Sequence, residues 1–196
     1  DIVDLCRRRN VLLVSDEIYD EFCFHDMRSN GRCPSPARFT EDCLVIRGFG
    51  KTYGCTGWRL GYAAGPKFLV QEIAKLQQYT FVCAPSIAQW GVAAAFGVDL
   101  SPIVKEYEHR RQMVVEAFEG VTAVPRPGGA FYAFVEVPRR LGLTAQQFVE
   151  RAIAERVLII PGNVFSSRDT HFRLSFSAKR ESLAEGLGIL RRLMTA

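Results

Sequence analysis

Two short, wholly apolar runs constrain this chain most: residues 11–14 (VLLV) and residues 43–46 (CLVI). Such runs are typical of strands buried on both faces, as in parallel sheets that helices cover. Helical patterns flank these runs, at residues 1–10 and 66–79, so the sequence predicts an α/β fold. Open α/β sheets bind ligands beyond the carboxyl ends of their strands. The residues directly after positions 14 and 46 are therefore the first candidates for a binding site.

Reactive side chains follow both runs. Asp16 and Tyr19 come directly after the first run, and a glycine-rich stretch with Lys51 and Arg59 follows the second. A lysine in such a place either holds a phosphate or attacks a carbonyl through its free amine. Residues 50–52 (GKT) look like the end of a phosphate-binding P-loop, but that motif needs a glycine where Val45 stands. The P-loop is therefore rejected, and the nucleophile remains.

Three separate stretches carry a family resemblance: residues 16–19 (DEIY), 51–62 (KTYGCTGWRLGY) and 172–177 (FRLSFS). In this order they resemble the class I and II aminotransferases, fold-type I enzymes similar to aspartate aminotransferase that use pyridoxal 5′-phosphate (PLP). The resemblance covers nearly all of this chain but only about the C-terminal half of such an enzyme. It implies a mainly parallel-sheet PLP-binding large domain followed by a small α+β domain.

The resemblance also implies a role for five residues. Lys51 is similar to the lysine that binds PLP covalently and moves a proton during the reaction. Asp16 is similar to the partner of the pyridine nitrogen, and Tyr19 to the donor that bonds the ring's phenolic oxygen. Arg59 is similar to the arginine on the cofactor phosphate, and Arg173 to the arginine that binds the α-carboxylate of the substrate. An arginine's planar fork suits both anions.

The chain departs from the family pattern in two respects. Serines usually stand where this chain has Gly48 and Gly50. A lost hydrogen bond to a charged group costs about 1.5–3 kcal/mol, so cofactor binding is expected to weaken. The family's other cofactor contacts come from its N-terminal half, which no stretch here resembles. We therefore expect that this chain, with Asp1 in place of an initiator Met, is cut from a larger one and does not complete catalysis alone.

The chain is expected to form two parts. Residues 1–98 are assigned to the C-terminal part of the large domain, and residues 99–196 to a small α+β domain with an antiparallel sheet. In the second part, Arg173 lies on the strand face opposite Phe172 and Leu174. The elements predicted there are strands at 121–124, 130–137, 157–160 and 171–176, with helices at 102–119, 144–155 and 180–194.

Composition limits the binding partners and cellular locations that we expect for this chain. The net charge is +4 with interspersed acidic and basic residues, which indicates no nucleic-acid surface, and no apolar run reaches the length of a membrane span. The six cysteines form no C-x-x-C pair, which suggests reduced thiols in the cytoplasm, and the three histidines have no metal-ligand spacing. Resemblance implies a homodimer that acts on amino acids and 2-oxo acids. Two alternatives stay open: a PLP-dependent lyase of the same fold, and a non-catalytic packing or partner-binding module.

Overall fold

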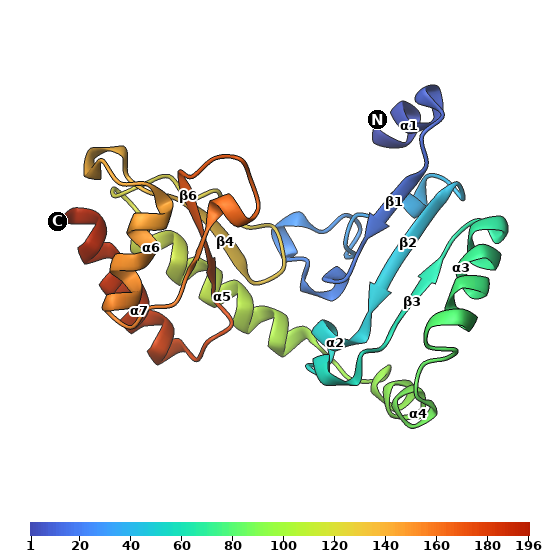
Figure 1. The fold of residues 1–196 in the computed structure, drawn as a ribbon. Coiled ribbons are helices and arrows are strands. Elements are labelled where there is room, and N and C mark those ends of the chain that lie inside the picture. The colour runs from blue at the N-terminus through green and yellow to red at the C-terminus, as the bar shows by residue number, and fades with distance from the viewer. The chain divides into compact units, whose positions relative to one another are not determined.

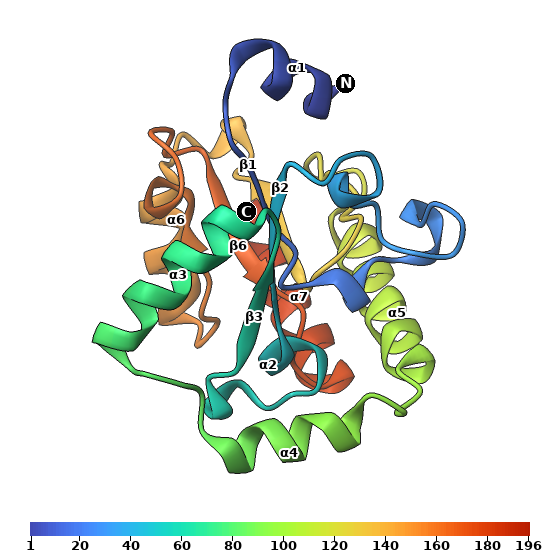
Figure 2. The same ribbon diagram turned by 90° about the vertical axis from the view of Figure 1, so that its right-hand side faces the viewer.

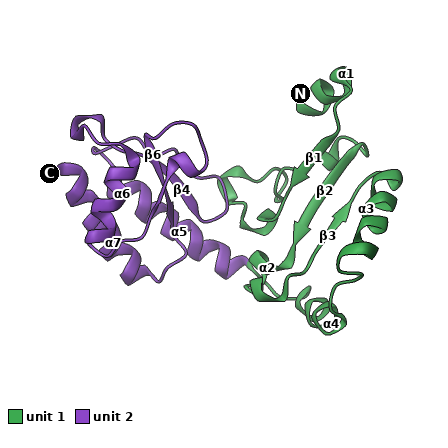
Figure 3. Ribbon diagram, in the orientation of Figure 1, with its two compact units in different colours: residues 1–100 green, residues 101–196 purple.

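The computed structural model describes all of residues 1–196 and has the α/β fold that the sequence predicts (Figure 1). The chain divides into two compact units, residues 1–100 and residues 101–196 (Figure 3). Each unit has its own three-stranded sheet. No helix in either unit combines the length and the apolar composition that crossing a membrane requires.

The first unit is built on a mixed sheet with strand order β1-β2-β3. β1 runs parallel to β2, with Asp16 opposite Ile46, and β3 runs antiparallel to β2, with Gly61 opposite Gly48. Helix α3 follows β3 and lies beside it in Figure 1 and in Figure 2. The elements are α1 (Ile2–Arg9), β1 (Leu13–Asp16), β2 (Cys43–Gly48), α2 (Phe49–Thr52), β3 (Gly61–Ala64), α3 (Lys67–Thr80) and α4 (Ser86–Ala95). Short 3-10 turns, η1 (Asp20–Phe22), η2 (His25–Met27), η3 (Pro36–Arg38) and η4 (Thr56–Trp58), connect them.

The first unit buries less apolar surface than its sequence predicts. β1 begins two residues later than the run at 11–14, and it alternates between half-buried and exposed residues, with Val14 48% exposed. The prediction that this run is buried on both faces is therefore wrong for the chain as described. Helix α3 has no buried residue, although Phe68 and Leu76 give it an apolar side. In contrast, Cys43, Leu44 and Val45 of the central strand are buried.

The second unit has an antiparallel sheet with strand order β4-β6-β5, packed with three helices. Alternate residues Phe172, Leu174 and Phe176 are buried, and the ring of Phe148 stacks on Phe172 with 5.3 Å between centroids. The elements are α5 (Ser101–Phe118), β4 (Tyr132–Glu136), α6 (Ala145–Ala154), β5 (Ile160–Pro161), β6 (His171–Ser175) and α7 (Arg180–Thr195). The 3-10 turns are η5 (Arg139–Leu141) and η6 (Gly162–Val164).

Two predicted strands of the second unit are corrected by the structure. Residues 121–124 are not a strand, because the N–H groups of Val121 and Thr122 bond back to the Phe118 carbonyl and close α5. The strand expected at 157–160 shrinks to Ile160–Pro161. Its first residue, Val157, instead donates to the Ala152 carbonyl at 2.8 Å and caps the end of α6.

Candidate active site

The parallel pairing of β1 and β2 places the residues that follow both strands at one edge of the sheet. Asp16 is the last residue of β1 and lies opposite Ile46, two residues before β2 ends at Gly48. The Asp16 side chain is exposed, and its Oδ1 accepts a hydrogen bond from the Ile18 N–H at 3.2 Å. This local turn restrains the carboxylate while the residue stays exposed. The predicted position of Asp16 at a strand end is confirmed.

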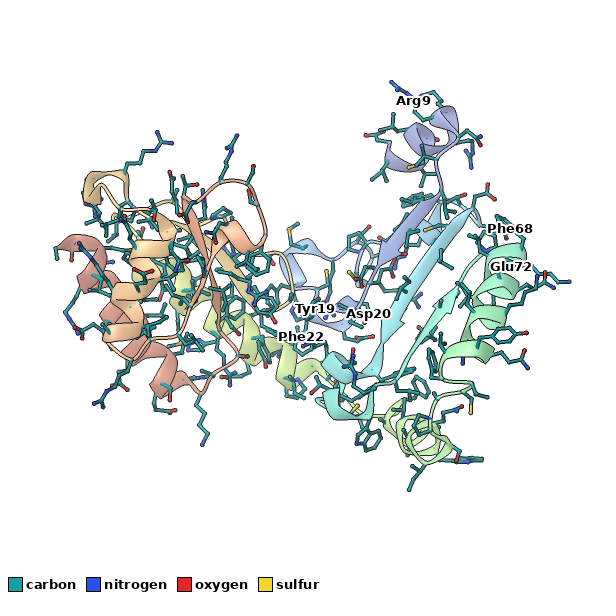
Figure 4. The ribbon with its side chains drawn as sticks, viewed as in Figure 1. Arg9, Tyr19, Asp20, Phe22, Phe68 and Glu72 are labelled. Carbon is teal, nitrogen blue, oxygen red and sulfur yellow. The ribbon has the colours of Figure 1, made fainter.

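Tyr19 lies three residues beyond β1 and begins turn η1, where its carbonyl accepts the Phe22 N–H at 2.9 Å. Turn η1 lies against α2, the element that carries Lys51. Figure 4 shows Tyr19, Asp20 and Phe22 together beside the carboxyl half of β2. The side chain of Tyr19 is half-buried, so part of it remains accessible to a ligand.

Lys51 lies in α2, a single helical turn, rather than in the open loop that the sequence predicts. The turn is held in place at its first residue, Phe49. The Phe49 N–H donates to the Leu60 carbonyl at 3.2 Å, and its ring lies 5.5 Å from the ring of Tyr62 and 5.8 Å from that of Phe96. Lys51 itself is half-exposed. Its amine is therefore carried on a fixed turn beside the strand ends.

Arg59 follows turn η4 and has a left-handed backbone, with φ 54°. Its side chain is exposed and Nη1 donates to the Thr56 carbonyl at 3.3 Å. The neighbouring Trp58 packs on Gly91 of α4, where a Cβ would lie 2.7 Å from the indole ring. Gly91 thus allows η4 to dock on α4. Arg59 stands two residues before Gly61, the β3 partner of Gly48, so the register places it near the start of α2.

One group at this edge escaped the sequence analysis. The buried carboxylate of Glu17 accepts hydrogen bonds from Ser15, Ser35 and Arg47, and Arg47 also contacts Asp20. Glu17 and Arg47 are 30 positions apart, so no spacing rule reveals the pair. Glu17 belongs to the stretch at 16–19, whereas Arg47 lies outside all three stretches that carry the family resemblance.

Arg173 lies in the second unit, on β6, between Phe134 of β4 and Ile160 of β5. It is half-exposed, while Phe172 and Leu174 on either side are buried, so the predicted alternation is confirmed. The central carbon of its guanidinium group lies over two aromatic rings. The distance from this carbon to the ring centroid is 4.6 Å for Tyr132 and 4.5 Å for Phe165. These rings restrict the planar group while leaving its edge able to bind a carboxylate.

The donor set of the first unit fits the PLP that the resemblance implies. PLP presents a carbonyl carbon, a ring nitrogen, a phenolic oxygen and a phosphate. The sheet edge presents a lysine amine, a carboxylate, a phenol and a guanidinium from Lys51, Asp16, Tyr19 and Arg59. Space beside Gly50 is limited, because a Cβ there would lie 3.1 Å from the Cα of Thr56.

Comparison with known proteins identifies the family and relatives of this chain. Residues 1–190 match the family described as aminotransferase class I and II. The chain is 33% identical to the aspartate aminotransferase of Thermotoga maritima over 95% of its own length and 48% of that protein. It is 29% identical to the aspartate aminotransferase of Pyrococcus abyssi over 99% of its length and 51% of that protein. The chain thus spans about half the length of the curated relatives it matches.

Solved structures give the same result for the fold. A crystal structure of aromatic aminotransferase from Pyrococcus horikoshii superposes with a TM-score of 0.89 at 29% identity, covering 99% of this chain and 54% of that one. Aspartate aminotransferase from Thermotoga maritima also gives a TM-score of 0.89, at 30% identity, covering 100% of this chain and 51% of that one. Both units are matched, since nearly the whole chain is covered.

Proposed function

The chain belongs to the class I and II aminotransferase family, and on that premise we propose that it forms part of a PLP-dependent aminotransferase. The proposed reaction moves the amino group of an amino acid to a 2-oxo acid. In this assignment residues 1–100 are the C-terminal part of the PLP-binding large domain and residues 101–196 are the small domain. The homodimer and the cytoplasmic location stay predictions from the sequence.

Each proposed role follows from the chemistry of one side chain. When bound, PLP supplies an electron-accepting ring conjugated to its carbonyl carbon. The Lys51 amine would hold the cofactor covalently at that carbon, the carbonyl oxygen leaving as water, and as a free amine it would carry a proton to and from the substrate's α-carbon. The Asp16 carboxylate keeps a proton on the ring nitrogen, and the Tyr19 hydroxyl donates to the phenolic oxygen. Arg59 binds the phosphate as a planar donor.

Substrate binding is assigned to the second unit. The guanidinium of Arg173 is held between the rings of Tyr132 and Phe165 and can offer two parallel N–H donors to an α-carboxylate. Every amino acid and 2-oxo acid substrate carries this carboxylate. Arg173 therefore recognises the substrate class and leaves the choice of side chain to other groups.

One observation supports the proposal above all: the segments that carry Asp16, Tyr19, Lys51 and Arg59 all follow the strand ends at one end of the β1-β2-β3 sheet, where η1 and η4 both contact α2. A set of groups collected only to stabilise the fold would be buried. Instead, Asp16 and Arg59 are exposed, and Tyr19 and Lys51 are half-exposed. Exposed, mutually complementary groups at a strand edge are typical of a ligand site in α/β proteins.

The test is covalent capture of the cofactor. The full protein chain is mixed with PLP, reduced with borohydride and digested, and the labelled peptides are mapped. We expect the label on Lys51 in preference to the other lysines, and its loss in Lys51→Ala. Lys67→Ala, an exposed lysine at the start of α3, is the matched control and keeps the label. Equal labelling of surface lysines, or an unchanged absorbance spectrum in Lys51→Ala, would refute the proposal.

A further inference from the structure

Glu17 is a buried acidic residue that lies in the sequence between Asp16 and Tyr19 of the proposed site. Its side chain is 7% exposed, although Asp16 immediately before it is exposed. The Glu17 N–H donates to the Ile46 carbonyl at 2.8 Å, which continues the pairing of β1 with β2 beyond the end of β1. The backbone that leads from Asp16 to Tyr19 is thus attached to β2 at this point.

Both oxygens of the Glu17 carboxylate are saturated with hydrogen bonds. Oε1 accepts from the hydroxyls of Ser35 at 2.5 Å and Ser15 at 3.1 Å. Oε2 accepts from Nε and Nη2 of Arg47 at 3.0 and 2.7 Å. Burial by itself would raise the pKa of Glu17, but the hydrogen bonds from Ser35, Arg47 and Ser15 outweigh it and lower the pKa. The group is therefore a charged, fully bonded carboxylate that does not turn toward a ligand.

Arg47 connects this carboxylate to the rest of the sheet edge. Its Nη1 lies 3.2 Å from the Asp20 carboxylate, so one guanidinium binds two acids of the segment after β1. Arg47 is on β2, where it pairs in register with Tyr62 of β3, and it precedes Lys51 by four residues. Asp20 directly follows Tyr19. The ion pairs therefore join the two segments that carry Tyr19 and Lys51.

We propose that Glu17 and Arg47 are positioning residues of the cofactor site: their buried ion pair fixes Asp16 and Tyr19 relative to Lys51. This inference rests on the proposed function. Neither residue is catalytic, since both act through their neighbours. Glu17→Gln removes the charge that receives the Arg47 bonds, while Asp20 remains as a counter-ion of the partly exposed Arg47. The segment between β1 and η1 is therefore expected to be held less tightly to β2.

Glu17→Gln tests the positioning, because it keeps the size and an acceptor for the serines while it removes the charge. Arg47→Lys is the second variant, since it keeps the charge but cannot bind Glu17 and Asp20 together. Glu106→Gln is the matched control: Glu106 also accepts bonds from two arginines, Arg110 and Arg180, but lies in the second unit. Each full-chain variant is titrated with PLP, and the spectrum of the Lys51-bound cofactor is followed against pH.

A readout that does not involve PLP is hydrogen exchange of the amides of residues 17–22. The Phe22 N–H, bonded to the Tyr19 carbonyl, reports the segment directly. We expect Glu17→Gln to accelerate exchange there and to weaken PLP binding about 10- to 100-fold, as loss of an outer partner does at other sites. Arg47→Lys should show the same changes to a smaller degree, with a displaced pH dependence of the spectrum. Glu106→Gln should leave both readouts as in the wild type.

The outcomes separate this inference from the proposed function. Wild-type protein that labels Lys51 while Glu17→Gln binds PLP with unchanged affinity and pH dependence would overturn the positioning role alone. Faster exchange in residues 17–22 with unchanged PLP binding would also overturn it, because the pair would then serve stability only. Absence of label on Lys51 in the wild type would overturn the proposed function and the positioning role together.

Discussion

A single methyl group at Gly162 is expected to destabilise the second unit. Gly162 is buried at the start of η6, directly after β5. A Cβ there would lie 2.9 Å from Cζ of Phe134 and closer still to the carbonyl oxygen of His171, a backbone atom of the central strand β6. Because that backbone is bonded on both sides, it cannot move without disturbing the sheet. Overpacking of this kind costs about 1–3 kcal/mol, and we expect Gly162→Ala to lose that amount of unfolding free energy.

Gly188 of α7 provides the matched control in the same unit. It is exposed, and a Cβ there would meet no atom within 4 Å. Alanine inside a helix is favoured over glycine by about 0.5–1 kcal/mol, so Gly188→Ala should stabilise the protein. The two variants carry the same chemical change and are expected to differ by about 1.5–4 kcal/mol, the sum of the two effects.

Urea unfolding followed by far-UV circular dichroism measures the difference, with hydrogen exchange of the β6 amides as the local probe. Tryptophan fluorescence does not serve, since Trp58 and Trp90 both lie in the first unit. Equal unfolding free energies for Gly162→Ala and Gly188→Ala would refute the reasoning. A second consequence is local: the Gly162 carbonyl accepts the Phe165 N–H at 2.9 Å, so exchange at Phe165 should also accelerate.

Two further predictions concern charges in the second unit. Hydrogen bonds from Arg180 and then Arg110 hold the pKa of Glu106 at about 2, below its usual 4.5. The Glu106 carboxylate therefore contributes fully to stability above pH 4.5 and progressively less as the pH falls toward 2, so urea unfolding of Glu106→Gln and wild type should converge over that range. If the difference between them stayed constant with pH, the ion pairs would not be its cause. Phe165→Leu removes one of the rings over Arg173, a contact worth about 0.5–1 kcal/mol at an exposed site, so we expect a two- to fivefold rise in the dissociation constant for the amino acid. An unchanged dissociation constant would contradict the role given to that ring.

Sequence patterns predicted best the elements whose cause is local. Helix α6 follows from the capping box of Thr144 and Gln147, which donate to each other across the first turn. Strand β6 follows from the alternation of Phe172, Arg173 and Leu174. In both cases the determining residues lie within a few positions of one another, so the pattern itself contains the physical reason for the structure.

The predictions that were wrong have causes elsewhere in the chain. Lys51 lies on a helical turn rather than a loop because Phe49 is anchored by Leu60 and by the ring of Phe96, contacts that no local pattern encodes. The helix period over residues 144–155 predicts that Ile153 faces inward, yet its side chain is 50% exposed, since the period alone does not say how much of an apolar face its neighbours cover. The ion pair of Glu17 and Arg47 is likewise a product of parallel strand pairing.

Long-range packing also affects Gly48 and Gly50, the two glycines before Lys51, and with them the groups available to bind a phosphate. The resemblance led us to expect serines at these positions, whose hydroxyls would help to bind a phosphate. In this structure the Cδ1 atom of Ile18 occupies the space that a side chain at Gly48 would need, and the Cα of Thr56 restricts Gly50. Ile18 belongs to the segment that the Glu17 ion pair attaches to β2. A side chain at position 48 would require the flexible end of Ile18 to move. Because this chain has no hydroxyl at position 48, in the proposed function Arg59 carries a larger share of phosphate binding.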